Sequence, residues 1–98
     1  MGTIVLMRIE FDPDKDRINI AKHNGLSLAD AERVSWDEAI HYPDNRFAYG
    51  EARISALVPF ENRLCHVTFT ERGEDWIRVI SLRYAERTEV AFYVRNYR

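Results

Sequence analysis

The sequence has a single cysteine, Cys65, and no apolar run near the ~18 residues that a membrane-spanning helix needs. One cysteine excludes an internal disulfide and is typical of a protein in a reducing compartment. The apolar segment 1–7 is short and has no basic leader, so we expect no signal peptide. These absences predict a cytoplasmic protein without a membrane partner. Cys65 lies in an apolar alternation, which favours a buried thiol over a nucleophile.

An excess of basic residues is also missing, because 14 lysines and arginines are set against 16 acidic residues and the net charge is −2. Proteins that bind nucleic acid usually carry a basic excess, so the net charge argues mildly against that class. The distribution of the arginines still leaves room for a local basic surface. The C-terminal half contains Arg53, Arg63, Arg72, Arg78, Arg83 and Arg87.

Common catalytic and cofactor patterns are absent as well. The four glycines form no glycine-rich phosphate loop, and there is no Ser-His-Asp pattern. The histidines His23, His41 and His66 have no metal-ligand spacing and no cysteine cluster beside them. We therefore expect neither a metal nor a cofactor.

The chain does have enough apolar sequence for a folded domain. Hydrophobic residues make up 46% and charged residues 31% of its 98 residues, which argues against a disordered chain. No repeat, low-complexity tract or linker divides it. We therefore expect a single domain over residues 1–98.

Alternation of apolar and polar residues predicts strands over 51–60 and 65–83, the latter interrupted by a turn that contains Gly73. The segment 61–62 is a credible two-residue turn between the first two strands. One sheet face then collects Ile54, Ala56, Val58, Cys65, Val67, Phe69, Ile77 and Val79. The other face collects Arg53, Ser55, Leu57, His66, Thr68, Thr70, Trp76, Arg78 and Ile80.

The registers behind this partition follow from the turns. Pairing Phe60 with Arg63 sets Ile54 opposite Phe69. Pairing Thr70 with Trp76 sets Thr68 opposite Arg78 and His66 opposite Ile80. Directly opposed residues point to the same side, and a one-residue slip would move every apolar side chain to the wrong face.

Helices are expected at three places. Asp12-Pro13 supplies an N-cap and a proline at the first helical position, so a helix follows over about 13–23 and ends at Asn24-Gly25. Ser27, with Asp30 three residues later, caps a second helix that carries Leu28, Ala31 and Val34 at helical spacing. A third helix is expected over 86–95.

These elements predict an α+β fold. A first strand over 3–11 precedes the two N-terminal helices, and the strands over 51–83 and the C-terminal helix complete the order. We expect an antiparallel sheet of about four strands, with two N-terminal helices on one face and a C-terminal helix.

Arg53 and Arg78 are the leading candidate site residues, since the register places both on the polar face with two threonines between them. Two neighbouring guanidiniums on an open sheet make a phosphate-binding geometry. The alternative is that they form ion pairs with Glu51, Glu71 or Glu74.

Other polar residues have a structural and a functional interpretation. His66 has the intrinsic pKa of a general acid or base, but a histidine in a strand is more often packed or at the surface. Lys22-His23 closes the first helix, where cations favour the helix C-terminus. Trp76 and Tyr84 either stack on bases or cover the sheet.

The chain resembles the BrnT-type ribonuclease toxins of bacterial type II toxin–antitoxin systems. The resemblance covers nearly the whole chain, in order. Its pieces are Phe11-Asp12, Asn19 to Gly25, Asp30-Ala31, Tyr49 to Arg53, Thr70 to Gly73 and Ile77 to Arg83.

The resemblance implies a RelE-like α+β fold, RNA cleavage without a metal, and neutralisation by a BrnA-like antitoxin. That partner commonly carries a ribbon-helix-helix part, so DNA would be contacted only through the antitoxin. The family's arginines fall on Arg53, Arg78 and Arg83, and its acidic position falls on Glu71.

Two positions depart from the family pattern, since Tyr84 replaces a usual lysine and Glu86 a usual threonine. In a regular hairpin, moreover, Glu71 and Arg83 would lie seven rungs or roughly 23 Å apart, too far to contact one phosphate.

The resulting hypothesis is an endoribonuclease in which the ribose 2′-OH attacks the adjacent phosphorus. Arg53 and Arg78 would stabilise the transition-state charge, and Glu71 or His66 would move protons. The alternative is a catalytically weak or inactive member that serves as a protein-binding module and operon co-regulator. Net acidity and Tyr84 favour this alternative slightly.

Overall fold

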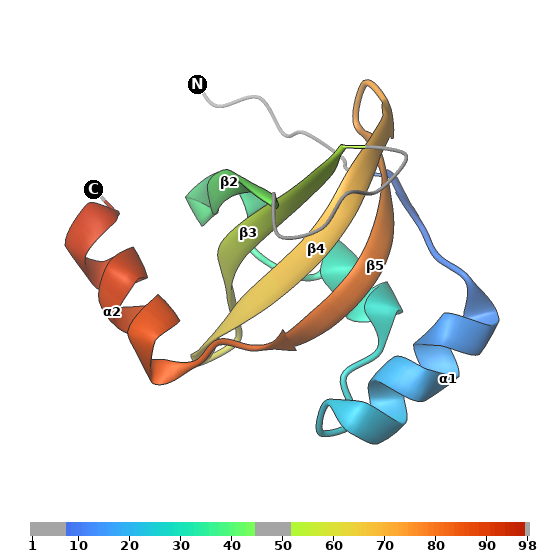
Figure 1. Ribbon diagram of the computed structural model, residues 1–98, viewed down its shortest axis with the longest axis horizontal. Coiled ribbons are helices and arrows are strands. Elements are labelled where there is room, and N and C mark those ends of the chain that lie inside the picture. The colour runs from blue at the N-terminus through green and yellow to red at the C-terminus, as the bar shows by residue number, and fades with distance from the viewer. Residues whose placement is uncertain (1–7, 45–51, 98) are drawn as a thin grey trace.

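The computed structural model describes residues 8–44 and 52–97 (Figure 1). Its sheet has five strands in the order β1-β5-β4-β3-β2. The strands are β1 (Arg8–Glu10), β2 (Ile40–Asp44), β3 (Arg53–Phe60), β4 (Arg63–Gly73) and β5 (Trp76–Tyr84). The helices are α1 (Pro13–Lys22), the 3-10 helices η1 (Leu28–Glu32) and η2 (Trp36–Glu38), and α2 (Arg87–Asn96).

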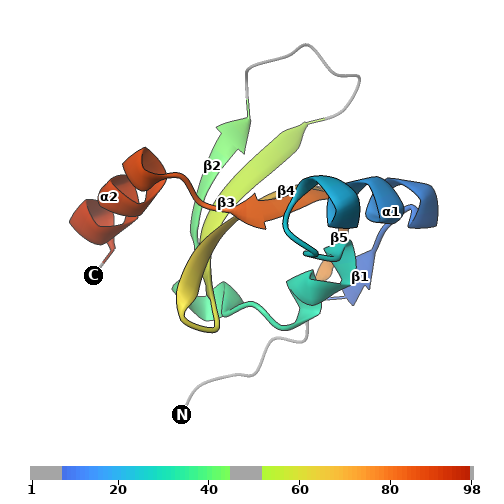
Figure 2. The same ribbon diagram turned by 90° about the horizontal axis from the view of Figure 1, so that it is seen from below.

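The α+β class is confirmed, but the expected wholly antiparallel sheet of about four strands is wrong. β2 adds a fifth strand to those expected, and β1 pairs in parallel with β5, with Ile9 opposite Ile77. The chain then crosses beneath the sheet through η1 and η2 to form β2 at the opposite edge (Figure 2). The pairing of β1 with β5 joins segments about seventy residues apart, and no local pattern specifies it. The part of the expected first strand in 3–7 lies outside the described residues.

The β3–β4 register and the apolar face are confirmed. Phe60 pairs with Arg63, and Ile54 pairs with Phe69. The packed core contains Ala56, Val58, Cys65, Val67, Phe69, Ile77 and Val79 from this face, with Ile54 partly buried against them. From below, Leu28, Ala31 and Val34 of the η1 region pack into the same core.

The β4–β5 register is wrong, because irregularities lie between Thr68 and Phe69 and between Glu71 and Gly73. Thr70 pairs with Arg78, and Ile80 is an extra residue with no partner in the register. A bulge reverses the facing of every residue beyond it. Leu82 therefore joins the core opposite Val67, and Arg83 moves to the polar face opposite His66.

The first helix has the expected caps. The Asp14 amide donates to Asp12 Oδ1 at 2.8 Å, and the chain leaves α1 through Asn24 and Gly25, which both have positive φ. α1 covers the outer edge of β5 beyond the short β1. The buried Asn19 accepts from the Leu82 amide at 3.2 Å and donates to the Leu82 carbonyl at 2.9 Å, so it replaces a neighbouring strand.

The expected second helix is wrong in length, since only the five-residue 3-10 helix η1 forms. Its capping box between Ser27 and Asp30 is present. A capping box specifies where a helix begins but not how far it continues. The spacing of Leu28, Ala31 and Val34 still buries all three.

The third helix forms as expected and lies apart from the main body of the sheet, beside the β2–β3 edge (Figures 1 and 2). α2 has no buried residue, and few of its side chains contact the sheet. Tyr93 donates to the Glu38 carbonyl at 2.6 Å, and the rings of Phe92 and Tyr42 are 6.4 Å apart. Among the helices of the described segments, none is long and apolar enough to cross a membrane.

Candidate active site on the polar face

The polar face is the sheet surface opposite the core, and its residues lie in three rows set by the strand register. The first row contains Arg53, Thr70, Arg78 and Glu10. Arg78 pairs with Thr70 of β4 on one side and with Glu10 of β1 on the other, and Arg53 of β3 lies at the level of Thr70. The second row is Tyr42, Ser55, Thr68 and Ser81. The third row is Ile40, Leu57, His66 and Arg83. The bulge at Ile80 thus brings a third arginine to the face that carries Arg53 and Arg78.

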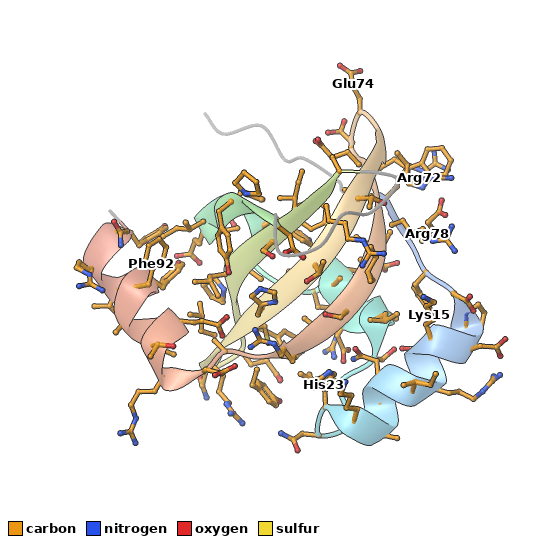
Figure 3. The ribbon with its side chains drawn as sticks, viewed as in Figure 1. Lys15, His23, Arg72, Glu74, Arg78 and Phe92 are labelled. Carbon is orange, nitrogen blue, oxygen red and sulfur yellow. The ribbon has the colours of Figure 1, made fainter. Side chains whose placement is uncertain are left out.

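Arg78 is more accessible than Arg83, with 41% of its side chain exposed against 23%. Its Nη1 lies 3.8 Å from Glu10 Oε2, a loose pair at the surface. Such pairs contribute at most about 1 kcal/mol. Figure 3 shows Arg78 on β5, well separated from Glu74 at the hairpin tip. An anionic ligand therefore has little to displace at Arg78.

Two of the predicted acidic alternatives form no ion pair with Arg78 in the part of the chain that the structure describes. Glu51 lies outside the described residues, and within 8–44 and 52–97 neither Glu71 nor Glu74 forms an ion pair with Arg78. The hydroxyl oxygen of Thr70, directly opposite Arg78, is buried and has no hydrogen-bond partner among the described residues. A buried unpaired hydroxyl is rare enough to be notable beside a candidate site.

Arg53 is half-buried in β3 at the end of the row that leads to Arg78. Its cross-strand neighbour on β2 is the buried Asp44. Opposite charges directly opposed on a sheet face stabilise the strand pair. The structure therefore brings together the two arginines that the sequence singled out.

Arg83 is held by the C-terminal helix. Its Nη1 and Nη2 donate to the two carboxylate oxygens of Glu89 at 2.8 and 2.9 Å. Hydrogen bonding to Glu89 raises the pKa of Arg83 further above its ordinary value. Burial raises the pKa of Glu89, but Arg83 and the Glu86 amide outweigh it, and the net pKa is lowered.

His66 is buried in β4, opposite Arg83. Its ring lies 6.3 Å from that of Tyr42 at 63°. Arg83, the cross-strand neighbour of His66, hydrogen-bonds to Glu89. His66, Arg83 and Glu89 form a compact group at one end of the polar face.

Glu71 is not brought to the arginines. It pairs with Ile77, so the register places it on the side of the sheet opposite Arg78, where it is exposed. The two bulges shorten its separation from Arg83, which now lies five rungs away, roughly 17 Å. Glu89, which hydrogen-bonds to Arg83 through both carboxylate oxygens, is an acid of the site that sequence reasoning missed. The only signal for it was its position three residues after Glu86, as in a capping box.

The other candidates have structural roles. Cys65 is buried as expected, and burial raises the pKa of its thiol to about 11. The guanidinium carbon of Arg63 lies 3.5 Å from the centre of the Tyr84 ring, and that of Arg8 lies 5.0 Å from the Trp76 ring. Both rings are half-buried, which supports the interpretation that they cover the sheet. In the described parts of the chain, no three His, Cys, Asp or Glu residues are grouped to hold a metal ion.

The chain thus combines a mixed sheet, a polar face with three arginines and a helix along one edge. Residues 11–89 match the family model described as ribonuclease toxin, BrnT, of type II toxin–antitoxin system. The chain therefore belongs to this family of ribonuclease toxins.

A solved structure supports the same placement. The Brucella abortus ribonuclease toxin BrnT superimposes with a TM-score of 0.64 and is 32% identical to this chain. The match covers 83% of this chain and 99% of the Brucella chain. The comparison with curated proteins gives no match.

Proposed function

We propose that this chain is an active endoribonuclease that cleaves RNA on the polar face without a metal. The observation that carries the proposal is the row formed by Arg53, Thr70 and Arg78, with an accessible guanidinium beside a buried unpaired hydroxyl. Guanidiniums are well suited to phosphate, because their planar donors match its oxygens. Family membership supports RNA as the substrate.

The proposed chemistry needs no external nucleophile. The ribose 2′-oxygen attacks the adjacent phosphorus, the bond from phosphorus to the 5′-oxygen breaks, and a cyclic phosphate and a free 5′-OH result. Arg78 and Arg53 stabilise the extra negative charge of the transition state. A base accepts the 2′-OH proton, and the departing 5′-oxygen receives a proton.

We assign proton transfer to His66 rather than to Glu71. His66 lies on the polar face beside Arg83, whereas Glu71 lies on the opposite side of the sheet. An imidazole has an ordinary pKa near neutrality and can serve as base and acid in turn. Arg83 then orients the site through Glu89 rather than contacting the phosphate directly.

The proposed partners are RNA and a BrnA-like ribbon-helix-helix antitoxin encoded beside the toxin, with DNA reached only through that antitoxin. The setting is the cytoplasm, where both RNA and the antitoxin are made. The support is membership in a type II toxin–antitoxin family.

A second candidate is a catalytically weak member that acts as a protein-binding module. The observation that favours it is the pairing of Arg83 with Glu89, which occupies one of the family's arginines. Tyr84, packed under Arg63 where the family usually has lysine, removes a further cation.

A cleavage assay separates these candidates. The purified chain is incubated with an RNA oligonucleotide in excess chelator, and with the same oligonucleotide fully 2′-O-methylated. Active enzyme should cleave only the unmodified RNA and leave a cyclic phosphate detectable by mass spectrometry. Activity lost in chelator would refute the metal-free mechanism. No cleavage by a chain that still binds its antitoxin would establish the second candidate.

A further inference from the structure

A groove of about 260 Å³ lies between α1 and β5, away from the residues of the proposed catalytic site. Its lining is Lys15, Ile18, Asn19, Lys22 and His23 from α1, with Ile80 and Ser81 from β5. Ser81 pairs with Thr68, so the groove borders the middle row of the polar face. The groove is thus continuous with the surface that carries Arg78.

The bulged residue Ile80 lines this groove, and α1 forms its other side. α1 is attached to β5 through Asn19, whose side chain bonds both backbone groups of Leu82. β1 is parallel to β5 and leads directly into α1, so α1 follows β5 from the Arg78 end toward the Arg83 end. Lys15 and Lys22 are seven residues apart, two helical turns or about 10 Å along one side of α1.

The acidic residues of α1 do not neutralise this side. Asp14 forms an ion pair with Arg17, and Asp16 accepts hydrogen bonds from the Ser27 hydroxyl and the Leu28 amide. Lys15 and Lys22 are exposed and, within the described ranges, have no acidic partner. A net positive strip therefore remains along the groove of an acidic protein.

The pKa of His23 reflects the positive charge around this end of α1. Burial, Lys22 and Arg83 together hold the pKa of His23 below its ordinary value. Asn19, four residues before His23, bonds to Leu82, the neighbour of Arg83 in β5, so this end of α1 lies near the third row of the polar face. In Figure 3, Lys15 and His23 project from the side of α1 nearest the sheet, with Arg78 beyond Lys15.

We propose that the groove between α1 and β5 binds the phosphate backbone of the RNA that is cleaved on the polar face. Lys15 and Lys22 contact phosphates flanking the scissile one, and the Ser81 hydroxyl donates from the groove floor. A cationic groove that tracks the backbone gives sequence-tolerant binding of single strands. This inference rests on the proposed function, because it takes RNA as the ligand.

The test measures binding separately from cleavage. A fluorescent 2′-O-methyl RNA, which cannot be cleaved by 2′-OH attack, is titrated with wild type and with the double variant Lys15→Ala/Lys22→Ala at several salt concentrations. For single strands the salt slope changes by ~0.7 per phosphate contact. Losing two contacts should lower the slope by roughly 1.4 and weaken binding roughly tenfold at 150 mM salt.

The matched control is Arg17→Ala/Arg95→Ala, which removes two positive charges from outside the groove. It should leave the salt slope near that of wild type, and thermal melting should show that both double variants are folded. An unchanged slope in Lys15→Ala/Lys22→Ala, or an equal loss in the control, would overturn the groove assignment. Selective loss of antitoxin binding with RNA affinity intact would overturn it as well.

The proposed function fails differently. If wild type neither binds nor cleaves RNA, both the proposed function and the proposed role of the groove are refuted. If wild type and the groove variant bind and cleave RNA equally well, only the proposed role of the groove is refuted. In the expected result, the groove variant raises KM several-fold with little change in kcat, since its lysines act on binding rather than on the reacting phosphate.

Discussion

At the scale of single residues, three arginines on one face differ in what they can still bind. Arg78 is more exposed than Arg83, and its ion pair with Glu10 is long. Arg83 is committed to Glu89 through two short hydrogen bonds. Charge-assisted bidentate bonds are among the strongest in proteins. Position on the polar face therefore does not by itself make an arginine available to substrate.

The first prediction concerns Arg78. Preorganised donors to a developing charge are worth about 10²–10³ in rate when one is removed. Arg78→Ala should lower RNA cleavage by about that factor without unfolding the protein. Arg95→Ala, which removes a cation from the exposed end of α2, serves as the control. Full activity in Arg78→Ala would refute the assignment of the site.

A second prediction concerns Glu89. Its pKa in the folded protein is lowered, so its contribution to stability is present above its ordinary pKa and is lost as pH falls through the folded value. Glu89→Gln should cost about 1–2 kcal/mol at neutral pH, because Arg83 keeps only part of its hydrogen bonding. The difference from wild type should shrink below about pH 4. Urea unfolding at pH 7 and pH 3 measures both values, and a cost that is independent of pH would contradict the ion-pair account.

At the scale of elements, α1 is attached to the sheet by one buried amide. Asn19 supplies the donor and acceptor that a longer β1 would otherwise offer to Leu82, and it also donates to the Leu26 carbonyl at 2.8 Å. Buried backbone groups without partners are costly. The short β1 is tolerated because α1 completes the edge of β5.

The third prediction tests this attachment. Asn19→Ala leaves the Leu82 amide and carbonyl without their partner, so it should destabilise the fold by about 2–3 kcal/mol. Ile18→Ala, at a neighbouring side chain that is 64% exposed, should cost less than about 0.5 kcal/mol. Chemical denaturation compares the two variants. Equal and small losses would show that α1 docks without the Asn19 bridge.

The packing of the sheet allows a fourth prediction. Phe69 is 3% exposed and meets the Trp36 ring edge-on at 5.5 Å between centroids. Phe69→Ala should destabilise by about 3–5 kcal/mol, as large-to-small changes in a core do. Val94→Ala, at a side chain that is 72% exposed on α2, should have little effect. A loss below about 1 kcal/mol for Phe69→Ala would place it outside the core.

At the scale of the whole molecule, charge is distributed unevenly over an acidic chain. The net charge is −2, yet the polar face and the adjacent groove carry arginines and lysines. A partner that neutralises the toxin can therefore do so by covering this one surface. α2 lies beside it and exposes Val90, Phe92, Val94 and Tyr97.

The fifth prediction follows for the antitoxin. A complex should form at low micromolar concentration or tighter, and it should cover Arg53 and Arg78. Modification of arginines by phenylglyoxal, read by mass spectrometry, should be slower at both positions in the complex than in the free toxin. A stable complex in which both arginines react at the free rate would contradict occlusion.

Local rules were sufficient for much of this fold. The caps of α1, the burial of Leu28, Ala31 and Val34, and the β3–β4 register follow from residues within a few positions of one another. Period-two alternation identified most of the core and placed Arg53 and Arg78 on the other face. These features depend on backbone geometry and on short turns, which neighbouring residues control.

Tertiary structure alone decided the rest. The parallel pairing of β1, the bulge that turns Arg83 to the polar face, and the docking of Asn19 on β5 join distant segments. The contact of Arg83 with Glu89 depends on where α2 packs. Nearest-neighbour patterns carry no information on such pairings, because their free energy comes from burial and hydrogen bonding that exist only after the chain has folded. The sequence by itself thus determined which residues are apolar, capped or charged, while the tertiary structure determined which charges share a surface.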